Sequence, residues 1–239
     1  MEVSHGQTSI KLGRLRKRDQ AYLFIKQLLL EGDAQPGDSL DINAIAHTLG
    51  MSRTPVLEAI TLLEREGWLS IIPQVGVFVR IVPSHELFQR IVARAALEGL
   101  LAQYAARAIT SQTLDELEKL LREMEQPTTD ALHYSELNRR FHALIHEAAD
   151  MPLIHEMVNQ LWDTLEYTGL AKQLFADRAA SLREHRVILA ALQRRDPQAA
   201  REAAEHHVLR VAELFAPLAQ EAVPSDTRFM RSSRRLPKG

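Results

Sequence analysis

The N-terminal third of the chain alternates short amphipathic segments with turn residues. Apolar positions follow the helical period over 19–31, 41–49 and 54–66, the last with Thr54 as the expected N-cap and Pro55 as the first helical residue. Two β-rich runs follow at 68–72 and 77–80, joined by a short turn. The pattern predicts three short helices and a hairpin, the layout of a winged helix-turn-helix.

From Ser84 onward the hydrophobic pattern is typical of long amphipathic helices only. Proline and capping residues separate six such segments, which we expect at 84–108, 112–126, 130–149, 152–171, 177–195 and 197–216. Long helices joined by short turns pack as antiparallel neighbours. The sequence therefore predicts a mainly α protein: an N-terminal winged helix-turn-helix followed by an antiparallel bundle of about six helices.

Charge is distributed unevenly along this pattern. Residues 1–82 contain 9 basic (Lys plus Arg) and 9 acidic (Asp plus Glu) residues. Residues 83–221 contain 15 basic and 21 acidic residues, and residues 222–239 contain 5 and 1. Basic clusters often contact phosphate, and a solvated terminus is the alternative explanation. We expect four parts: a flexible basic N-terminus (1–18), a winged-helix domain (19–82), a helical domain (83–221) and a disordered basic tail (222–239).

Composition excludes several classes of protein. The chain of 239 residues contains no cysteine, which rules out disulfides, Cys-ligated metal sites and thiol catalysis. No stretch approaches the roughly 18 apolar residues of a membrane span, and the N-terminus lacks the apolar core of a signal peptide. The Gly-rich nucleotide motifs, the zincin motif and the nucleophile elbow are missing from the sequence. We expect a cytoplasmic protein that is not an enzyme.

The second and third predicted helices form the helix-turn-helix. In this motif the N-terminal residues of the second of its two helices enter the major groove of DNA. Ser52, Arg53 and Thr54 occupy that place and carry donors for phosphate oxygens and base edges. The alternative is that Ser52 and Thr54 only cap the helix and that Arg53 is a solvated charge.

The same segment resembles the DNA-binding domain of GntR-family transcriptional regulators over about 19–82. The resemblance is carried by Pro36-Gly37, Ile45-Ala46, Leu49-Gly50-Met51-Ser52-Arg53-Thr54-Pro55-Val56, Leu63-Glu64-Arg65-Glu66-Gly67-Trp68-Leu69 and Gly76-Val77-Phe78-Val79. It implies DNA contacts by Ser52, Arg53, Thr54 and Gly76. At Leu57 the family usually has Arg, so the resemblance also implies that one DNA contact is missing.

Seven of the ten histidines lie between 133 and 207 in the predicted bundle. His142 follows Asn138 by four residues, so both lie on one helix face, and His185 and His207 lie on the last two helices. Three imidazoles and an oxygen ligand can bind zinc or nickel. Spacing alone does not bring these helices together, and core or surface histidines are the alternative.

The flanking residues resemble the FCD effector-binding domain of the FadR-like GntR branch over about 84–216. The resemblance is carried by Arg94-Ala95-Ala96-Leu97-Glu98, Asn138-Arg139-Arg140-Phe141-His142, Glu184-His185-Arg186-Val187-Ile188 and Ala200 to His207. It implies a divalent metal, with zinc as the first choice, bound by Asn138, His142, His185 and His207, and a small carboxylate effector bound near Arg94. Asn138 stands where the family has Asp, which removes a negative charge from the site.

Four residues near these positions have alternative roles. His206 is the alternative to His207 as a ligand, because it is adjacent and points about 100° away from His207 on a helix. His146 is expected to support the site or to lie at the surface. Arg94 and Glu98 have the spacing of a surface ion pair, whereas an Arg buried in the bundle needs an anionic partner.

Together these observations predict a homodimeric, ligand-responsive transcription factor. Its winged helices would bind a palindromic operator, and the effector would release repression by favouring another placement of the two winged helices. The alternative is a metal-dependent helical enzyme with an accessory DNA-binding module, which would need an open metal position beside a base.

Overall fold

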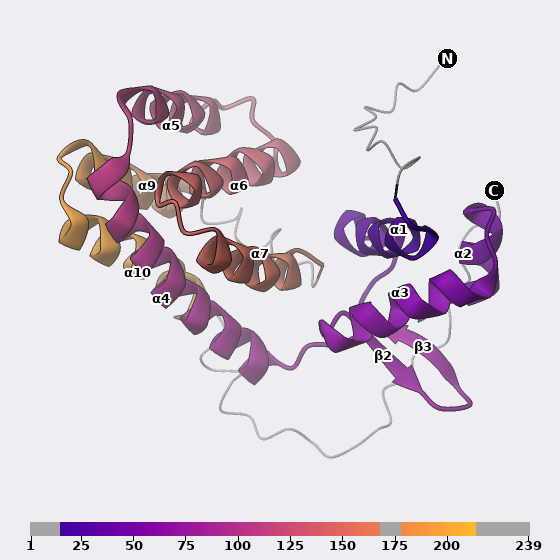
Figure 1. Cartoon of the computed structure of the whole chain (residues 1–239). Helices are drawn as coiled ribbons and strands as arrows, with labels where there is room; N and C mark the ends of the chain where they lie inside the picture. The colour runs from indigo at the N-terminus through magenta and orange to yellow at the C-terminus, as the bar shows by residue number, and fades with distance from the viewer. Residues whose placement is uncertain (1–14, 168–177, 214–239) are drawn as a thin grey trace. The chain divides into compact units, whose positions relative to one another are not determined.

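The computed structural model describes residues 15–167 and 178–213 (Figure 1). The described residues up to Ile81 form one compact unit, and those from Val82 form a second. Helices dominate both units, and the first also contains a small antiparallel sheet, so the predicted fold class is confirmed. Among the described helices, none is both long and apolar enough to span a membrane.

The first unit is a winged helix. Its elements are α1 (Lys17–Glu31), β1 (Ser39–Leu40), α2 (Ile42–Thr48), α3 (Arg53–Arg65), β2 (Leu69–Ile72) and β3 (Gly76–Val79). Strand β3 lies between β1 and β2 and is antiparallel to both, with Phe78 opposite Ser39 on one side and Ser70 on the other. The sequence did not predict β1, because two residues are too few to show an alternating pattern.

The core of the first unit lies between α1 and α3, which pack against each other. Both helices bury their apolar stripe completely: Ala21, Ile25, Leu29, Val56, Ala59, Ile60 and Leu63. Helix α1 ends at Gly32, whose φ of 80° lies in the left-handed region that a residue with a Cβ rarely adopts. The opposite face of α3 is left open to solvent.

Helix α3 begins two residues earlier than the predicted capping positions place it. The N-cap is Ser52, whose backbone is extended, and Arg53 is the first helical residue, so the prediction of Thr54 as N-cap was wrong. Proline is tolerated throughout the first turn of a helix, because the backbone N–H groups of that turn have no partner within the helix. Pro55 therefore did not mark the first helical position. Arg53 consequently belongs to the first turn of α3.

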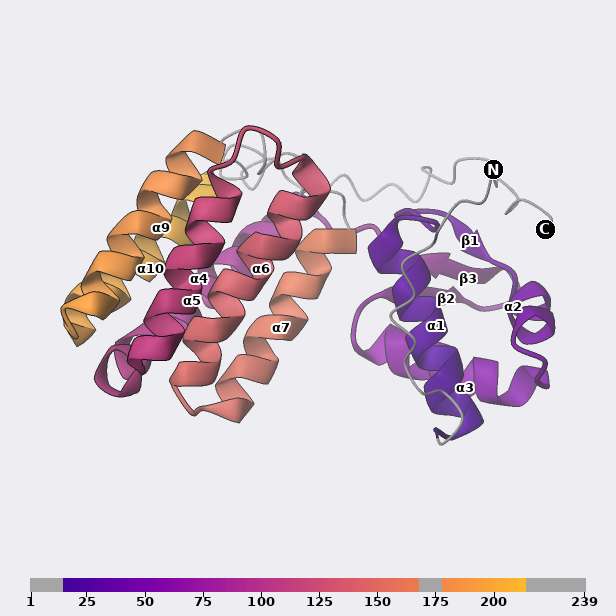
Figure 2. The ribbon, with the colours of Figure 1, turned by 90° about the horizontal axis from the view of Figure 1, so that it is seen from above.

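In the described part of the second unit, all regular elements are helices. They are α4 (Ser84–Ala108), α5 (Ser111–Met124), α6 (Ala131–Ala148), α7 (Pro152–Tyr167), α9 (Arg178–Gln193) and α10 (Pro197–Glu213). Helix α4 packs along α10 and also contacts α6, α7 and α9. Figure 2 shows the helices of this unit from above. Three predictions lie outside the described residues: the helix ends expected at 171 and 216, most of the basic N-terminus, and the basic tail.

The core of this bundle surrounds α4. Its largest fully buried side chains include Phe141 of α6, Leu101 and Ile109 at the C-terminal part of α4, and Leu117 and Leu121 of α5. Polar residues are also buried next to Phe141, and they form the candidate site.

Candidate functional site

Three histidines from three helices meet inside the bundle. His142 comes from α6, His185 from α9 and His207 from α10, and their side chains are almost completely buried. One ring nitrogen from each lies within 4.8 Å of those of the other two. The structure thus brings together three of the four residues for which the sequence suggested a metal-binding role.

The spacing of these nitrogens suits a single ion. The Nε2 atoms of His142 and His185 are 3.3 Å apart, and the rings of His185 and His207 have centroids 4.4 Å apart. Two nitrogens at about 2.0–2.1 Å from a tetrahedral zinc would be separated by about 3.3 Å. A small divalent cation therefore fits the donor set without a large rearrangement of these two imidazoles.

Carboxylates orient two of the three imidazoles. Glu98 of α4 places Oε2 2.7 Å from Nδ1 of His142, and Nδ1 of His207 is 2.8 Å from Oε2 of Glu184. A carboxylate that engages Nδ1 fixes the tautomer and leaves Nε2 with a free electron pair for a metal. In His142 this Nε2 is the atom that faces His185.

The protonation states also suit coordination. Burial lowers the pKa of His142 to about 4, and burial together with His207 and His142 lowers the pKa of His185 well below its usual range. Both rings are therefore neutral at neutral pH, as a metal ligand must be. The Nδ1 atom of His185 is buried and has no hydrogen-bond partner among the described residues, which is costly unless the ring makes another polar interaction.

Arg94 lies beside this cluster and is itself buried, with 3% of the residue exposed. Its Nε donates to Oε1 of Glu98 at 2.6 Å, and its guanidinium carbon lies 4.1 Å from the ring centroid of Trp162. Burial raises the pKa of Glu98, but Arg94 and His142 outweigh this and hold it well below its usual range. Within the described part of the chain, the two Nη groups of Arg94 make no hydrogen bond.

The sequence missed the role of Glu98. Its spacing from Arg94 suggested a surface ion pair, whereas the side chains are 1% and 4% exposed. Glu98 also lies 3.5 Å from Nε2 of His146, which is buried, so Glu98, His142 and His146 form a second group of potential ligands. The only clue in the sequence was an acidic residue on a helix rich in apolar positions.

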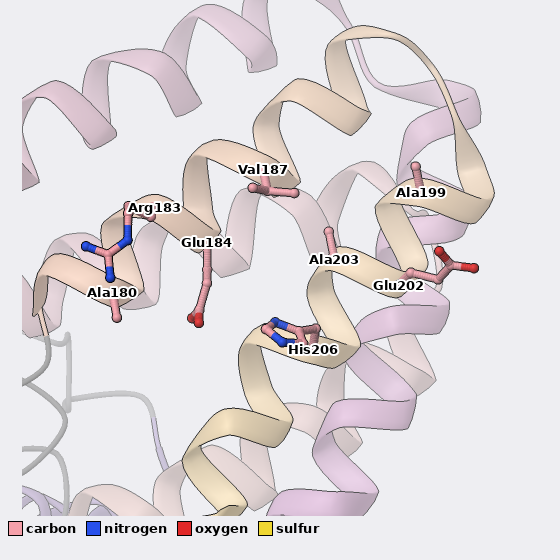
Figure 3. A pocket seen from close by; sticks show the side chains of 8 residues that line it. All are labelled: Ala180, Arg183, Glu184, Val187, Ala199, Glu202, Ala203 and His206. Carbon is pink, nitrogen blue, oxygen red and sulfur yellow. The ribbon is translucent and has the colours of Figure 1, made fainter.

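Asn138 and His206 take different positions relative to the cluster. Asn138 is half-buried on α6, one turn before His142, so its place as a fourth ligand stays a prediction. His206 is exposed and lines a groove of about 520 Å³ between α9 and α10, together with Arg183 and Glu184 of α9 (Figure 3). His207, not His206, therefore faces the other two histidines.

Of the residues expected to bind DNA, Ser52, Arg53 and Thr54 are exposed on the first unit and Gly76 is half-buried. Ser52, Arg53 and Thr54 form the start of α3, and Gly76 begins β3. A groove of about 390 Å³ between α3 and the β2–β3 hairpin is lined by Gly76 and by Leu57, one turn after Arg53. The start of α3 and the hairpin thus border one continuous surface.

Comparison with known proteins identifies both units. Residues 17–79 match the family described as bacterial regulatory proteins, gntR family, and residues 89–210 match the FCD domain. The chain therefore belongs to the GntR family of transcriptional regulators, in the FadR-like branch that carries an FCD domain.

Named relatives agree with this assignment. The chain is 33% identical to the HTH-type transcriptional regulator McbR of Escherichia coli K12 over 74% of its length and 82% of that protein. It is 27% identical to the HTH-type transcriptional repressor RspR of the same strain over 84% of its length and 90% of that protein. A solved structure of E. coli McbR/YncC superposes with a TM-score of 0.70 at 28% identity, covering 84% of this chain and 97% of that one.

These relatives define the class of activity. They are transcriptional regulators, so this protein is a DNA-binding transcriptional regulator and not an enzyme. The alternative of a metal-dependent helical enzyme is thereby set aside. The His cluster lies within the residues that match the FCD domain.

Proposed function

We propose that this regulator is a cytoplasmic homodimer that represses transcription from a palindromic operator and releases it when a small organic acid binds beside a metal ion. The observation that carries the proposal is the convergence of His142, His185 and His207 next to the buried Arg94. Ser52, Arg53, Thr54 and Gly76 would contact the operator.

The metal would be bound by Asn138, His142, His185 and His207. Zinc is our first choice because imidazole nitrogens and one oxygen suit it, and nickel is the alternative. When bound, the ion would supply a Lewis-acidic positive charge that accepts a carboxylate oxygen of the effector. Glu98 and Glu184 would hold the imidazoles of His142 and His207 in the orientation that leaves Nε2 free.

Arg94 would bind the effector carboxylate. Its Nε is occupied by Glu98 and its face lies on Trp162, which together fix the guanidinium plane. The two Nη groups make no hydrogen bond to described residues, and a carboxylate accepts from such a pair in a planar, bidentate arrangement. A buried guanidinium gains more free energy from pairing with an anion than an exposed guanidinium does.

Helix α4 links this site to the DNA-binding unit along the chain. It carries Arg94 and Glu98 and begins at Ser84, directly after the segment that leaves β3. We propose that the effector stabilises one position of α4, and that the two winged helices of the dimer then no longer match the half-site spacing. The coupling requires only that the effector binds the two arrangements with different affinity.

The DNA contact is tested by Arg53→Ala. We expect operator binding to weaken by about 1–3 kcal/mol, since a good Arg–base contact is worth that much, while the fold stays intact. Gel-shift titrations at fixed salt measure the change. Arg122→Ala, which removes an exposed arginine from α5, is the matched control and should bind as the parent does. Equal binding by Arg53→Ala and the parent would refute the assignment of α3 to the groove.

The metal site is tested by His185→Ala, with His206→Ala as the matched control. We expect His185→Ala to lose most of its bound metal and His206→Ala to keep it, because only His185 faces the cluster. Elemental analysis of protein dialysed against a small excess of zinc gives the metal content per chain. Full occupancy in His185→Ala would end the metal proposal.

The effector site is tested by Arg94→Lys, which keeps a positive charge beside Glu98. Calorimetric titration with acetate, succinate and citrate covers acids with one to three carboxylates. We expect unchanged metal content and an affinity for the best acid that is at least about tenfold lower, because lysine cannot make the bidentate contact. Unaltered acid affinity in Arg94→Lys would show that the effector binds elsewhere.

A further inference from the structure

The solvent-facing side of α3 is polar except at one position. Its exposed residues follow the helical period and comprise Arg53, Thr54, Leu57, Glu58, Thr61 and Arg65. Leu57 is 42% exposed and is the only large apolar residue of α3 that is exposed. It lies one turn after Arg53, on the face that α3 turns away from α1.

Two further apolar side chains extend this surface onto the hairpin. Ile71 of β2 is 39% exposed, and Val75 in the turn before β3 is 60% exposed. Both line the groove of about 390 Å³ that also contains Leu57 and Gly76, and most of the other residues that line it are apolar. Exposed apolar surface gathered in one hollow indicates a contact site rather than scattered surface residues.

DNA is the occupant that the position of this groove favours. Leu57 follows Arg53 and Thr54 on α3, and Gly76 borders the same hollow, so the groove continues the surface through which a winged helix meets DNA. The exposed apolar patch is small compared with the surface that a stable protein interface buries. In the major groove, the apolar group on a base edge is the 5-methyl group of thymine.

We propose that Leu57 determines operator specificity by packing against a thymine 5-methyl group in the major groove, with Ile71 and Val75 shielding the contact from water. The proposal rests on the DNA binding of this regulator and adds a residue to it. Four residues of helix advance about 6 Å, and base pairs are stacked at about 3.4 Å. The thymine therefore lies one or two base pairs from the base that Arg53 contacts.

Deoxyuridine provides the test because it differs from thymidine only by this methyl group. A duplex is first selected from a random-sequence pool with the full-length parent protein. Each thymine is then replaced by uracil, one at a time, and dissociation constants are measured at fixed salt. We expect the parent to lose about fourfold in affinity at one thymine in each half-site, the value of one buried methyl group. Leu57→Ala should bind the thymine and uracil duplexes equally at that position.

Three variants separate this role from other effects. Leu57→Gln keeps the length of the side chain at an exposed position, so it should fold as the parent does and also lose the discrimination. Leu132→Ala, which trims an exposed leucine of α6, is the matched control and should keep the fourfold preference. Arg53→Ala should bind both duplexes more weakly and retain their ratio.

The results that would contradict the role of Leu57 can be told apart from those that would contradict operator binding. A parent that is indifferent to uracil at every thymine, or a fourfold preference that persists in Leu57→Ala and Leu57→Gln, overturns the role of Leu57 and leaves DNA binding intact. A parent that enriches no duplex at all overturns operator binding as well as this inference.

Discussion

Two of the three histidines of the cluster have a carboxylate beside Nδ1. Glu98 engages Nδ1 of His142 and Glu184 engages Nδ1 of His207, whereas Nδ1 of His185 has no partner among the described residues. Glu98 is held as an anion by Arg94, and Glu184 is held as an anion by His207 and Arg210, which lower its pKa although burial raises it. The imidazoles of His142 and His207 are thus oriented by carboxylates, and the negative charge that would support a cation in the proposed site comes from the residues behind them.

Asn138→Asp tests the fourth ligand at the scale of a residue. A carboxylate adds a negative charge next to the ion, and a pair of charges about 4 Å apart is worth about 4 kcal/mol at a protein-like dielectric constant, before the cost of burying the carboxylate. We expect zinc affinity to rise by about tenfold to hundredfold, measured by competition with a chromophoric chelator.

The matched control for this prediction is Asn159→Asp on α7, which adds the same charge elsewhere in the helical unit. Its zinc affinity should stay close to that of the parent. If Asn138→Asp also leaves the affinity unchanged, Asn138 does not contact the ion and the fourth ligand must come from another residue or from the effector.

At the scale of elements, α4 determines how the bundle packs. It contributes Arg94 and Glu98 to the site, and at Gly99 it approaches α10 so closely that a Cβ would overlap the side chain of Glu205. Glu205 in turn forms an ion pair with Arg201, one turn away on α10. The close approach brings His207 of α10 near the residues carried by α4.

Gly99→Ala measures this close packing. Alanine favours a helix over glycine by about 1 kcal/mol, but here the overlap with Glu205 should outweigh the gain and destabilise the protein by about 1–3 kcal/mol. Urea denaturation gives the change. In the background of Glu205→Ala the same substitution should become neutral or stabilising, because the obstructing side chain is gone. Destabilisation of equal size in both backgrounds would place the clash elsewhere.

At the scale of the whole molecule, the residues proposed to contact DNA and those proposed to bind a metal and an effector lie in different units. The winged-helix unit contains Arg53 and Leu57, and the helical unit contains all the histidines of the cluster. Each unit has its own apolar core, so each has its own stability. A ligand of the helical unit should therefore stabilise that unit selectively.

Metal removal tests this separation. An ion that binds only the folded helical unit at about one hundred times its dissociation constant adds about 2.7 kcal/mol, which corresponds to a rise in Tm of about 10 °C for a unit of this size. We expect a chelator to lower the calorimetric transition of the helical unit by this amount and to leave that of the winged helix unchanged. His185→Ala should melt at the same temperature with and without zinc, and a chelator effect that persists in this variant would contradict the assignment of the ion to the cluster.

The sequence by itself determined the class of fold and most of the elements. Helical periodicity predicted the helix ends to within about two residues, apart from the expected ends at 171 and 216, which lie outside the described residues, because an amphipathic stripe is a local pattern. Local chemistry was less decisive at helix ends: Thr54 and Pro55 suggested a start that the structure places at Arg53. Several positions near a helix start satisfy the same capping preferences, and packing selects among them.

The tertiary structure decided which polar residues share a site. The sequence nominated His142, His185 and His207 through resemblance, but their distances depend on the packing of α6, α9 and α10 around α4. The same packing buries Glu98 and Arg94, which spacing alone allowed to be a surface pair. Burial and contacts between distant segments are properties of the assembled bundle, since a side chain loses its water only when another element covers it. Periodicity along one helix therefore determines which face turns inward, and only the neighbouring helices determine what that face meets.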